Sequence, residues 1–173
     1  MILTQYKPPD KLLSWLTYPE CLTAKLQIES GHAKLQLLSQ QWASPDVWDR
    51  CVLNLHIEPV LHREILMWSA DYPCWYARTI VPKTTYDKNP ILFNRLKHQS
   101  LGQLIFQDKC INRHDMMHFY ITEQSMEYAW LHQAMHQNSI VLWGRYSALM
   151  LHTIWPLFLI EIFLPGLLTV MTP

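Results

Sequence analysis

The chain has 173 residues, of which 50% are hydrophobic and 16% are charged. A charged fraction well below the usual quarter predicts that much of the chain is buried, or that part of it meets a partner or lipid. The length suits one domain that buries about two-thirds of the surface of its unfolded form. Fourteen basic residues balance fourteen acidic ones, so there is no basic excess to favour a nucleic-acid partner and no acidic tail to indicate disorder.

The four cysteines are free of any metal or redox spacing. Cys21, Cys51, Cys74 and Cys110 are separated by tens of residues, and no C-x-x-C occurs, which argues against a zinc site or a redox dithiol. The N-terminus, MILTQYKPPDKLL, lacks the basic and apolar regions of a secretory signal. Scattered free cysteines and this N-terminus predict a cytoplasmic protein.

The first half of the chain predicts two helical segments followed by strands. Residues 10–30 are helical in pattern, with Asp10 as a cap and leucines at helical spacing in KLLSWL. AKLQLLSQQW and VLNLHIE read as strands separated by the turn ASPDVWD. HREILMWSADYPCWYARTIVP predicts a hairpin, with a turn at SADYP and an end at Pro82.

The second half predicts one more helical region and two closing strands. NPILFNRLKHQSLGQLIF contains a helix, with a second short one before Phe106. The polar, His- and Met-rich residues 107–139 include TEQSMEYAWLHQAM, whose composition predicts a helical insert. VLWGRYSALMLHTIW and LFLIEIFLP are apolar strands. We therefore expect one α+β domain over residues 1–173, with a largely antiparallel sheet.

The apolar stretch IWPLFLIEIFLPGLLTV admits two interpretations. As a membrane span it is interrupted by Pro156 and Pro165 and carries one carboxylate, Glu161, near its centre. Proline inside a helix costs roughly 3 kcal/mol, and a central carboxylate adds roughly 2.5–3.5 kcal/mol to insertion. The eight residues between the prolines suit a buried strand, so we expect a strand and no transmembrane segment.

Two strands that are otherwise apolar each contain a single charge. Period-two alternation places Arg78 on one face of CWYARTIVP and Glu161 on one face of WPLFLIEIFLP. An isolated buried charge is costly, so each needs a partner. The two residues either form a structural ion pair or line a closed pocket. In a pocket, the arginine would bind a carboxylate bidentately, and the desolvated glutamate would act as acid, base or hydroxyl acceptor.

Four blocks carry a resemblance to a known family. REILMWSADYPCWYARTIVP, SLGQLIF, LWGRYS and EIFLP resemble, in order and spacing, chorismate lyase from about position 11 to 165. The resemblance implies a single domain whose antiparallel sheet carries helical flaps over a buried ligand site. It also implies conversion of chorismate to 4-hydroxybenzoate and pyruvate, the entry step to ubiquinone biosynthesis, without a metal or organic cofactor. Apart from the resemblance, we expect a monomer.

The resemblance also assigns site residues. Arg78 corresponds to the arginine that binds the ligand carboxylate, and Glu161 to the glutamate that faces the hydroxyl or ether end. Leu142 corresponds to a residue whose backbone N–H contacts the carboxylate. Leu22 takes the place of a flap methionine, a change that a backbone contact would survive. Arg145 could bind the second carboxylate of chorismate, although we favour a surface or sheet-edge position for it.

Two further alternatives remain at this stage. His132 and His136 have the i, i+4 spacing of a helical metal site, but a solvated helical insert is the interpretation that we favour. A non-catalytic domain of the same fold that binds an aromatic carboxylate is the alternative function. Such domains in bacterial regulators follow a DNA-binding unit, and only about ten residues precede the first predicted helix here, so we expect an enzyme.

Overall fold

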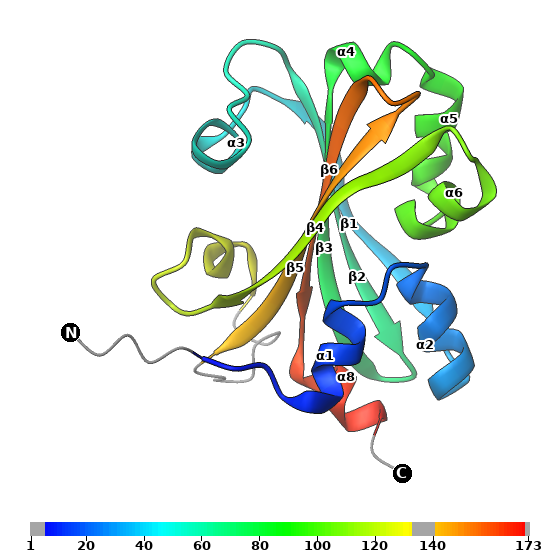
Figure 1. Ribbon diagram of the computed structural model, residues 1–173, viewed down its shortest axis with the longest axis vertical. Helices are drawn as coiled ribbons and strands as arrows, with labels where there is room; N and C mark the ends of the chain where they lie inside the picture. Colours follow the sequence, from blue (N-terminus) through cyan, green and yellow to red (C-terminus); the bar gives the residue numbers. More distant parts are fainter. Residues whose placement is uncertain (1–5, 133–140, 172–173) are drawn as a thin grey trace.

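A computed structural model describes residues 6–132 and 141–171 of the chain. It contains one six-stranded antiparallel sheet (Figure 1). The strands are β1 (Lys34–Ala43), β2 (Val60–Ser69), β3 (Tyr72–Pro82), β4 (Ile111–Ile121), β5 (Leu142–Leu151) and β6 (Trp155–Phe163). Their order across the sheet is β1-β2-β3-β6-β5-β4, and every neighbouring pair is antiparallel. The expected α+β fold with a single antiparallel sheet is confirmed.

Short helices lie on both sides of this sheet. They are α1 (Asp10–Leu16), α2 (Leu22–Ser30), α3 (Val47–Val52), α4 (Lys83–Tyr86), α5 (Pro90–Asn94), η1 (Arg95–Lys97), α6 (Leu101–Gln107), η2 (Met126–Trp130) and α8 (Pro165–Val170). In Figure 1 the sheet is seen nearly edge-on. Helices α1, α2, α5 and α6 lie to its right, whereas α3 and the yellow segment that contains η2 lie to its left.

Because side chains alternate along each strand, the sheet separates two hydrophobic clusters. The larger cluster joins one face of the sheet to buried residues of α1, α2, α5, α6 and α8. The smaller cluster joins the other face to Trp48 of α3 and to Leu131, with Trp130 packed against it. Within β3, Trp75 and Ala77 belong to the larger cluster, and Tyr76 belongs to the smaller one. We call these the larger-cluster face and the smaller-cluster face.

Two capping boxes explain helices that the hydrophobic pattern alone did not define. In α3 the Asp46 carboxylate accepts from the N–H of Asp49, and the Asp49 carboxylate accepts from the N–H of Asp46. In α6 the same exchange joins Ser100 and Gln103. Each box satisfies two backbone donors that a helix start would otherwise leave unpaired, so α3 and α6 begin at Val47 and Leu101.

The predicted strand VLNLHIE is wrong. Its first residue, Val52, is the last residue of α3, and the rest of the segment has no strand pairing. The alternating apolar residues of this segment imitate a strand. The capping box at Asp46 instead starts a helical turn. Leu53 and Leu55 pack against the smaller cluster from a loop, and Ile57 remains 96% exposed.

The helical insert predicted over residues 107–139 is wrong for residues 111–121. Ile111–Ile121 forms strand β4, which pairs with β5 along its whole length at the edge of the sheet. Between Asp108 and His132, where the structure describes this segment, helical structure is confined to the 3₁₀ segment Met126–Trp130. An edge strand is partly solvated on both faces. Its polar composition therefore lacks the hydrophobic pattern by which buried strands are predicted. Residues 133–140 lie outside the described part of the chain, as does the His136 half of the predicted histidine pair.

The strand interpretation of the apolar stretch near the end of the chain is confirmed. Residues Trp155–Phe163 form β6, between β3 and β5 in the middle of the sheet. Within the described residues, none of the helices has the length and apolar character needed to span a membrane. Pro165 then starts α8 at the first helical position, where its missing N–H costs nothing.

Helix α8 approaches strand β3 too closely for a side chain at Gly166. A Cβ atom at this position would lie 2.3 Å from the carbonyl oxygen of Pro73, well inside van der Waals contact. We therefore expect Gly166→Ala to push α8 away from β3 and to lower the free energy of unfolding by about 1–3 kcal/mol, the usual cost of overpacking. Urea denaturation followed by circular dichroism would measure the loss.

Thr169→Ala, on the exposed side of the same helix, is the matched control. It should change the free energy of unfolding by no more than about 0.5 kcal/mol. An equal effect of the two substitutions would contradict the close approach.

Candidate functional site

A closed cavity lies between the larger-cluster face of the sheet and the helices that cover it. Strand residues that point to this face form its floor, and residues from the start of α2 and α6 form its roof. Its polar lining residues are Glu20, Thr23, Arg63, Thr79, Ser100, Arg113, Arg145 and Glu161, and its apolar lining includes Leu22, Ile65, Met67, Trp75, Ala77, Leu101 and Leu159. The cavity thus combines an apolar wall with three guanidinium groups.

Glu161 and Arg145 form an ion pair in this cavity. They are directly opposite each other on β6 and β5, and Arg145 Nε donates to Glu161 Oε2. Glu161 is only 6% exposed and Arg145 only 1% exposed. Arg145 Nη1 also donates to the carbonyl oxygen of Tyr18 at 2.6 Å. Arg145 therefore positions the carboxylate and ties the connection between α1 and α2 to the sheet.

Arg63 is a second buried cation of the cavity, on β2. Its Nε donates to the carbonyl oxygen of Leu96 at 2.8 Å, and its Nη2 donates to that of Gln99 at 2.9 Å. Burial lowers the pKa of the Arg63 guanidinium to about 10, so the side chain still carries its charge at neutral pH. Two backbone carbonyls orient Arg63 without neutralising it, which leaves its positive charge available to an anion.

Arg113 is the third cation and comes from the edge strand β4. Its Nη1 donates to the carbonyl oxygen of Pro19 at 2.8 Å. Its Nε is buried and has no hydrogen-bond partner within the described residues. Burial lowers the pKa of Arg113, the positive charge of Arg145 lowers it further, and Glu161 acts in the opposite direction. The two arginines therefore repel each other across one carboxylate.

The starts of two helices meet above these charges. Leu22 and Leu101 are the first residues of α2 and α6, and both line the cavity. The first N–H groups of a helix have no partner within the helix, so both ends present backbone donors on this side. Thr23 Oγ1 and Ser100 Oγ are 3.2 Å apart and join the two helix starts.

The free volume of the cavity is about 30 Å³. Cavities that admit a benzene ring have a volume of roughly 150 Å³. A ring-sized ligand therefore does not fit the cavity in this structure, and its binding requires the covering segments to move. Tyr18 and Pro19, whose carbonyls bind Arg145 and Arg113, lie in the connection between two of those covering helices.

The structure brings Leu22 and Glu161 together but separates them from Arg78 and Leu142. Arg78 is opposite Ile160 in β6, whereas Glu161 is opposite Ala77. Arg78 and Glu161 are thus on neighbouring strands but point to opposite faces of the sheet, so the prediction that they share a pocket is wrong. They do not pair with each other either. Leu142 belongs to the smaller cluster and is likewise remote from the cavity.

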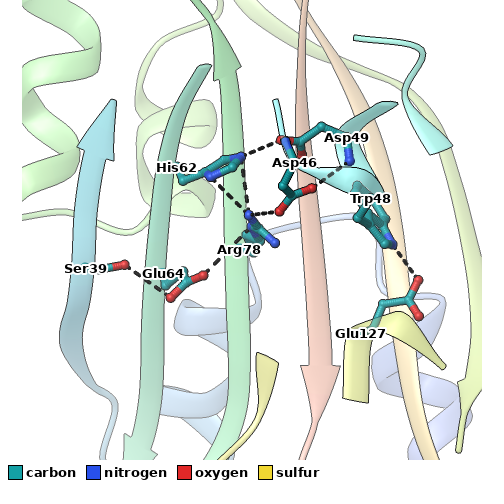
Figure 2. Close-up of polar contacts among 8 residues, drawn as sticks. All are labelled: Ser39, Asp46, Trp48, Asp49, His62, Glu64, Arg78 and Glu127. Carbon is teal, nitrogen blue, oxygen red and sulfur yellow. Dashed lines mark hydrogen bonds and ion pairs between the residues drawn. The ribbon is translucent and has the colours of Figure 1, made fainter. Parts of the chain in front are cut away.

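Arg78 instead belongs to a polar network on the smaller-cluster face (Figure 2). Its Nη2 donates to Asp46 Oδ2 at 2.7 Å, and its guanidinium lies 4.5 Å from the centroid of the Trp130 ring. The same Nη2 is 3.0 Å and 3.3 Å from the two ring nitrogens of His62. Such similar distances place it over the imidazole face. Together with Glu64, 3.9 Å away, these contacts give Arg78 a structural role.

The expectation that Arg145 is a surface or sheet-edge arginine is also wrong, because it is buried beside Glu161. A possible metal group does occur elsewhere. Ligand atoms of Asp46, Asp49 and His62 lie within 4.8 Å of one another. Arg78 already supplies the cation there, since its guanidinium contacts Asp46 and His62, so we assign no metal to this group.

The sequence patterns did not identify Arg63, Arg113 and Leu101 as residues of the cavity. Arg63 follows the same rule that was applied to Arg78, since it is one charge on the face of HREILM that carries Ile65 and Met67. The adjacent Glu64 and His62 made that strand look less apolar and concealed the signal. Arg113 lies in a segment that was assigned as helix, so its position on the sheet could not be inferred.

The chain is thus a small α+β domain with an arginine-lined cavity between its sheet and helices. Comparison with known proteins gives the family. The sequence profile of the family described as chorismate lyase matches residues 4–171, and the chain belongs to this family.

Two relatives illustrate the similarity. A protein of Aromatoleum aromaticum named "Probable chorismate pyruvate-lyase" is 29% identical over 167 residues, which cover 95% of this chain and 90% of that protein. A "Chorismate pyruvate-lyase" of Pectobacterium carotovorum is 27% identical over 158 residues, covering 91% and 78% of the two chains.

Solved structures of similar fold include regulators. A GntR-family transcriptional regulator from Bacillus cereus aligns with a TM-score of 0.55 and 10% identity, over 77% of this chain and 92% of that one. The effector domain of PhnF from Mycobacterium smegmatis aligns with a TM-score of 0.53 and 15% identity, over 83% and 88%. At these identities the likeness shows a common fold alone.

The buried pair of Arg145 and Glu161 can be tested by removing one partner. Arg145→Met should lower the free energy of unfolding by about 3–5 kcal/mol, because it leaves the Glu161 carboxylate buried without its cation. Arg145→Met combined with Glu161→Gln should recover much of that loss. Urea denaturation of the wild type, both single variants and the double variant measures the coupling, and strictly additive losses would contradict a direct pair.

Stability should depend on pH through Asp46. Burial acts to raise the pKa of Asp46, but the hydrogen bonds from the Asp49 N–H and from Arg78 prevail and lower it below 3.8. A lowered pKa contributes stability that is complete above the unfolded value and is lost as the pH falls through the folded value. Asp46→Asn keeps a capping side chain and should cost about 1 kcal/mol at pH 7.

The difference in unfolding free energy between wild type and Asp46→Asn should shrink as the pH falls below 4, because the wild-type carboxylate becomes neutral as well. Urea titrations at pH 7, 5 and 3 compare the two proteins. A difference that stays constant over this range would show that the Asp46 charge contributes nothing.

Proposed function

We propose that this protein is a chorismate pyruvate-lyase, which converts chorismate to 4-hydroxybenzoate and pyruvate. The observation that carries the proposal is a closed cavity in which Glu161 lies among three arginines, in a chain of the chorismate lyase family. The ubiquinone pathway as the destination of the product, the cytoplasm as location and the monomeric state are parts of the same proposal.

The reaction needs little from the protein beyond positioning and proton transfer. The C–O bond between the ring and the enolpyruvyl group breaks, and a ring proton is lost from the carbon that bears the hydroxyl group, so the ring becomes aromatic. The released enolpyruvate takes up a proton on its methylene carbon and becomes pyruvate. No water is consumed and no electrons enter or leave. A site without a cofactor is therefore sufficient for this chemistry.

Arg63 and the starts of α2 and α6 are suited to bind the ring carboxylate. Arg63 is fully buried, keeps its charge, and is fixed by two backbone carbonyls. A guanidinium binds a carboxylate with charge-assisted hydrogen bonds. The backbone N–H groups of Leu22 and Leu101 lie at the same cavity and would donate to the same group. We therefore give Arg63 and Leu101 the carboxylate-binding roles that the family resemblance assigned to Arg78 and Leu142.

Glu161 is suited to act at the opposite, hydroxyl-bearing end of the ring. It is buried, and one of its oxygens is fixed by Arg145. The other oxygen can accept the proton that leaves the hydroxyl-bearing ring carbon as the C–O bond breaks, and the resulting carboxylic acid can return a proton to the released enolpyruvate. Apolar residues line the rest of the cavity, and an apolar surrounding strengthens each electrostatic contact.

Three matched variants test the assignment by turnover. Purified protein is incubated with chorismate, and 4-hydroxybenzoate is followed in the ultraviolet. Glu161→Gln should lower kcat by about 100-fold or more, which is the usual contribution of general acid–base catalysis. Arg63→Gln should raise KM by about 10- to 100-fold, since hydrogen bonds to a charged group are worth roughly 1.5–3 kcal/mol. Arg78→Gln, on the opposite face, should retain the wild-type rate at a temperature where it is folded.

The outcomes separate the possible functions. A wild type that binds 4-hydroxybenzoate, seen as a raised melting temperature, but never turns over chorismate would be a binding domain and would overturn the proposal. Loss of turnover in folded Arg78→Gln with full activity in Glu161→Gln would place the site on the smaller-cluster face.

A further inference from the structure

The cavity carries a larger positive charge than one carboxylate of a ligand requires. Arg63, Arg113 and Arg145 contribute three positive charges, and Glu161 contributes one negative charge, which leaves a net charge of +2. Glu20 also lines the cavity but is exposed at its mouth. If the proposed function holds, the substrate is a dianion with two carboxylates, whereas the aromatic product has only one. The net charge matches the substrate.

Arg145 is not available for the second carboxylate. Its Nε is bonded to Glu161, and its Nη1 donates to the carbonyl oxygen of Tyr18. Each pair of adjacent donors on a guanidinium includes Nε or Nη1, so a bidentate carboxylate on Arg145 would have to displace Glu161 or the carbonyl oxygen of Tyr18. Under the proposed function, Arg63 binds the ring carboxylate at the other end of the cavity. The remaining cation is Arg113.

The Arg113 guanidinium has one buried N–H donor without an acceptor, which indicates a place where an anion could bind. Its Nε is buried without a hydrogen-bond partner in the described part of the chain, and buried N–H groups are seldom left unpaired. Nη1 is held by the carbonyl oxygen of Pro19. Arg113 also faces the like charge of Arg145. An anion at Nε and Nη2 would satisfy the donor and relieve the repulsion.

Arg113 is better placed to contact a substituent on the ring of the ligand than to contact the ring itself. Arg113 lines both the inner cavity and an outer depression of about 400 Å³. Glu20 and Gly102 also border these two spaces. Lys109 and Asn112 line that depression as well. Arg113 therefore stands between the closed cavity and the surface, where a flexible side arm of a buried ring would extend.

We propose that Arg113 binds the carboxylate of the enolpyruvyl group of chorismate and thereby distinguishes substrate from aromatic product. This inference rests on the proposed function and deepens it. Arg113 keeps its contact as the C–O bond breaks, because the same carboxylate then belongs to the released three-carbon acid. No contact with Arg113 remains for 4-hydroxybenzoate, whose single carboxylate lies at Arg63.

The test compares the two ligands on one variant by isothermal titration calorimetry. On a Glu161→Gln background, which slows turnover, the Kd of chorismate and the Kd of 4-hydroxybenzoate are measured with and without Arg113→Gln. Chorismate should bind about 10- to 100-fold more weakly, as expected for the loss of a charge-assisted bidentate contact, and 4-hydroxybenzoate should change by less than about twofold. An unchanged Kd for 4-hydroxybenzoate also shows that the cavity is intact.

Two further variants make the comparison specific. Arg113→Lys restores the charge without the planar fork and should recover part of the chorismate affinity. Arg95→Gln removes an arginine that is paired with Asp108 outside the cavity and should change neither Kd.

Equal weakening of both ligands by Arg113→Gln, or no effect on chorismate, would overturn the role of Arg113. Neither result would affect the proposed function. That function is tested separately by turnover in the wild type, whose absence would overturn the lyase while leaving the binding comparison measurable.

Discussion

The ion pair of Arg145 and Glu161 is the interaction on which the site depends. A lone carboxylate at the centre of a six-stranded sheet would be strongly unfavourable, and the arginine directly opposite it on β5 offsets that cost. The same guanidinium holds the carbonyl oxygen of Tyr18. One arginine therefore links the central strands, the proposed catalytic carboxylate and the segment that closes the cavity. Opening the cavity for a ligand must disturb these contacts or move around them.

Because side chains alternate along each strand, the charged residues of the sheet form two groups, one on each face. Residues on the larger-cluster face, among them Arg63, Arg145 and Glu161, surround a cavity. Residues on the other face, among them His62 and Arg78, form a network with Asp46 and Asp49 that fixes α3 against the sheet. The two groups are neighbours along the chain, but the sheet separates them. A shift of one residue in register would exchange their roles.

Much of the fold follows from the sequence, and part of the site follows as well. The hairpin of β2 and β3 and the strands β5 and β6 have apolar patterns long enough to identify them. Glu161 and Leu22, two of the predicted site residues, line the same cavity. The placement of Arg78 beside them was wrong, because alternation tells which residues of one strand share a face but does not tell whether the faces of two strands agree. That depends on register, which pairs Ala77 and not Arg78 with Glu161.

The other failures have local physical causes. Strand β4 is an edge strand with polar residues on both faces, so neither of the usual periodicities marks it. Because β4 was not predicted as a strand, Arg113 could not be placed on the sheet. In α3, two reciprocal hydrogen bonds between Asp46 and Asp49 outweigh an alternating pattern that resembles a strand. Both errors arise where a few polar contacts decide the local structure and hydrophobic burial does not.

The fold is shared with the ligand-binding domains of bacterial regulators, so the site and not the fold must decide between catalysis and binding. The most direct measurement is a crystal structure of the protein with 4-hydroxybenzoate. We predict the ligand between the sheet and the starts of α2 and α6, with its carboxylate on Arg63 and its hydroxyl group against Glu161. A ligand bound instead on the smaller-cluster face, against Arg78 and Trp130, would contradict this account.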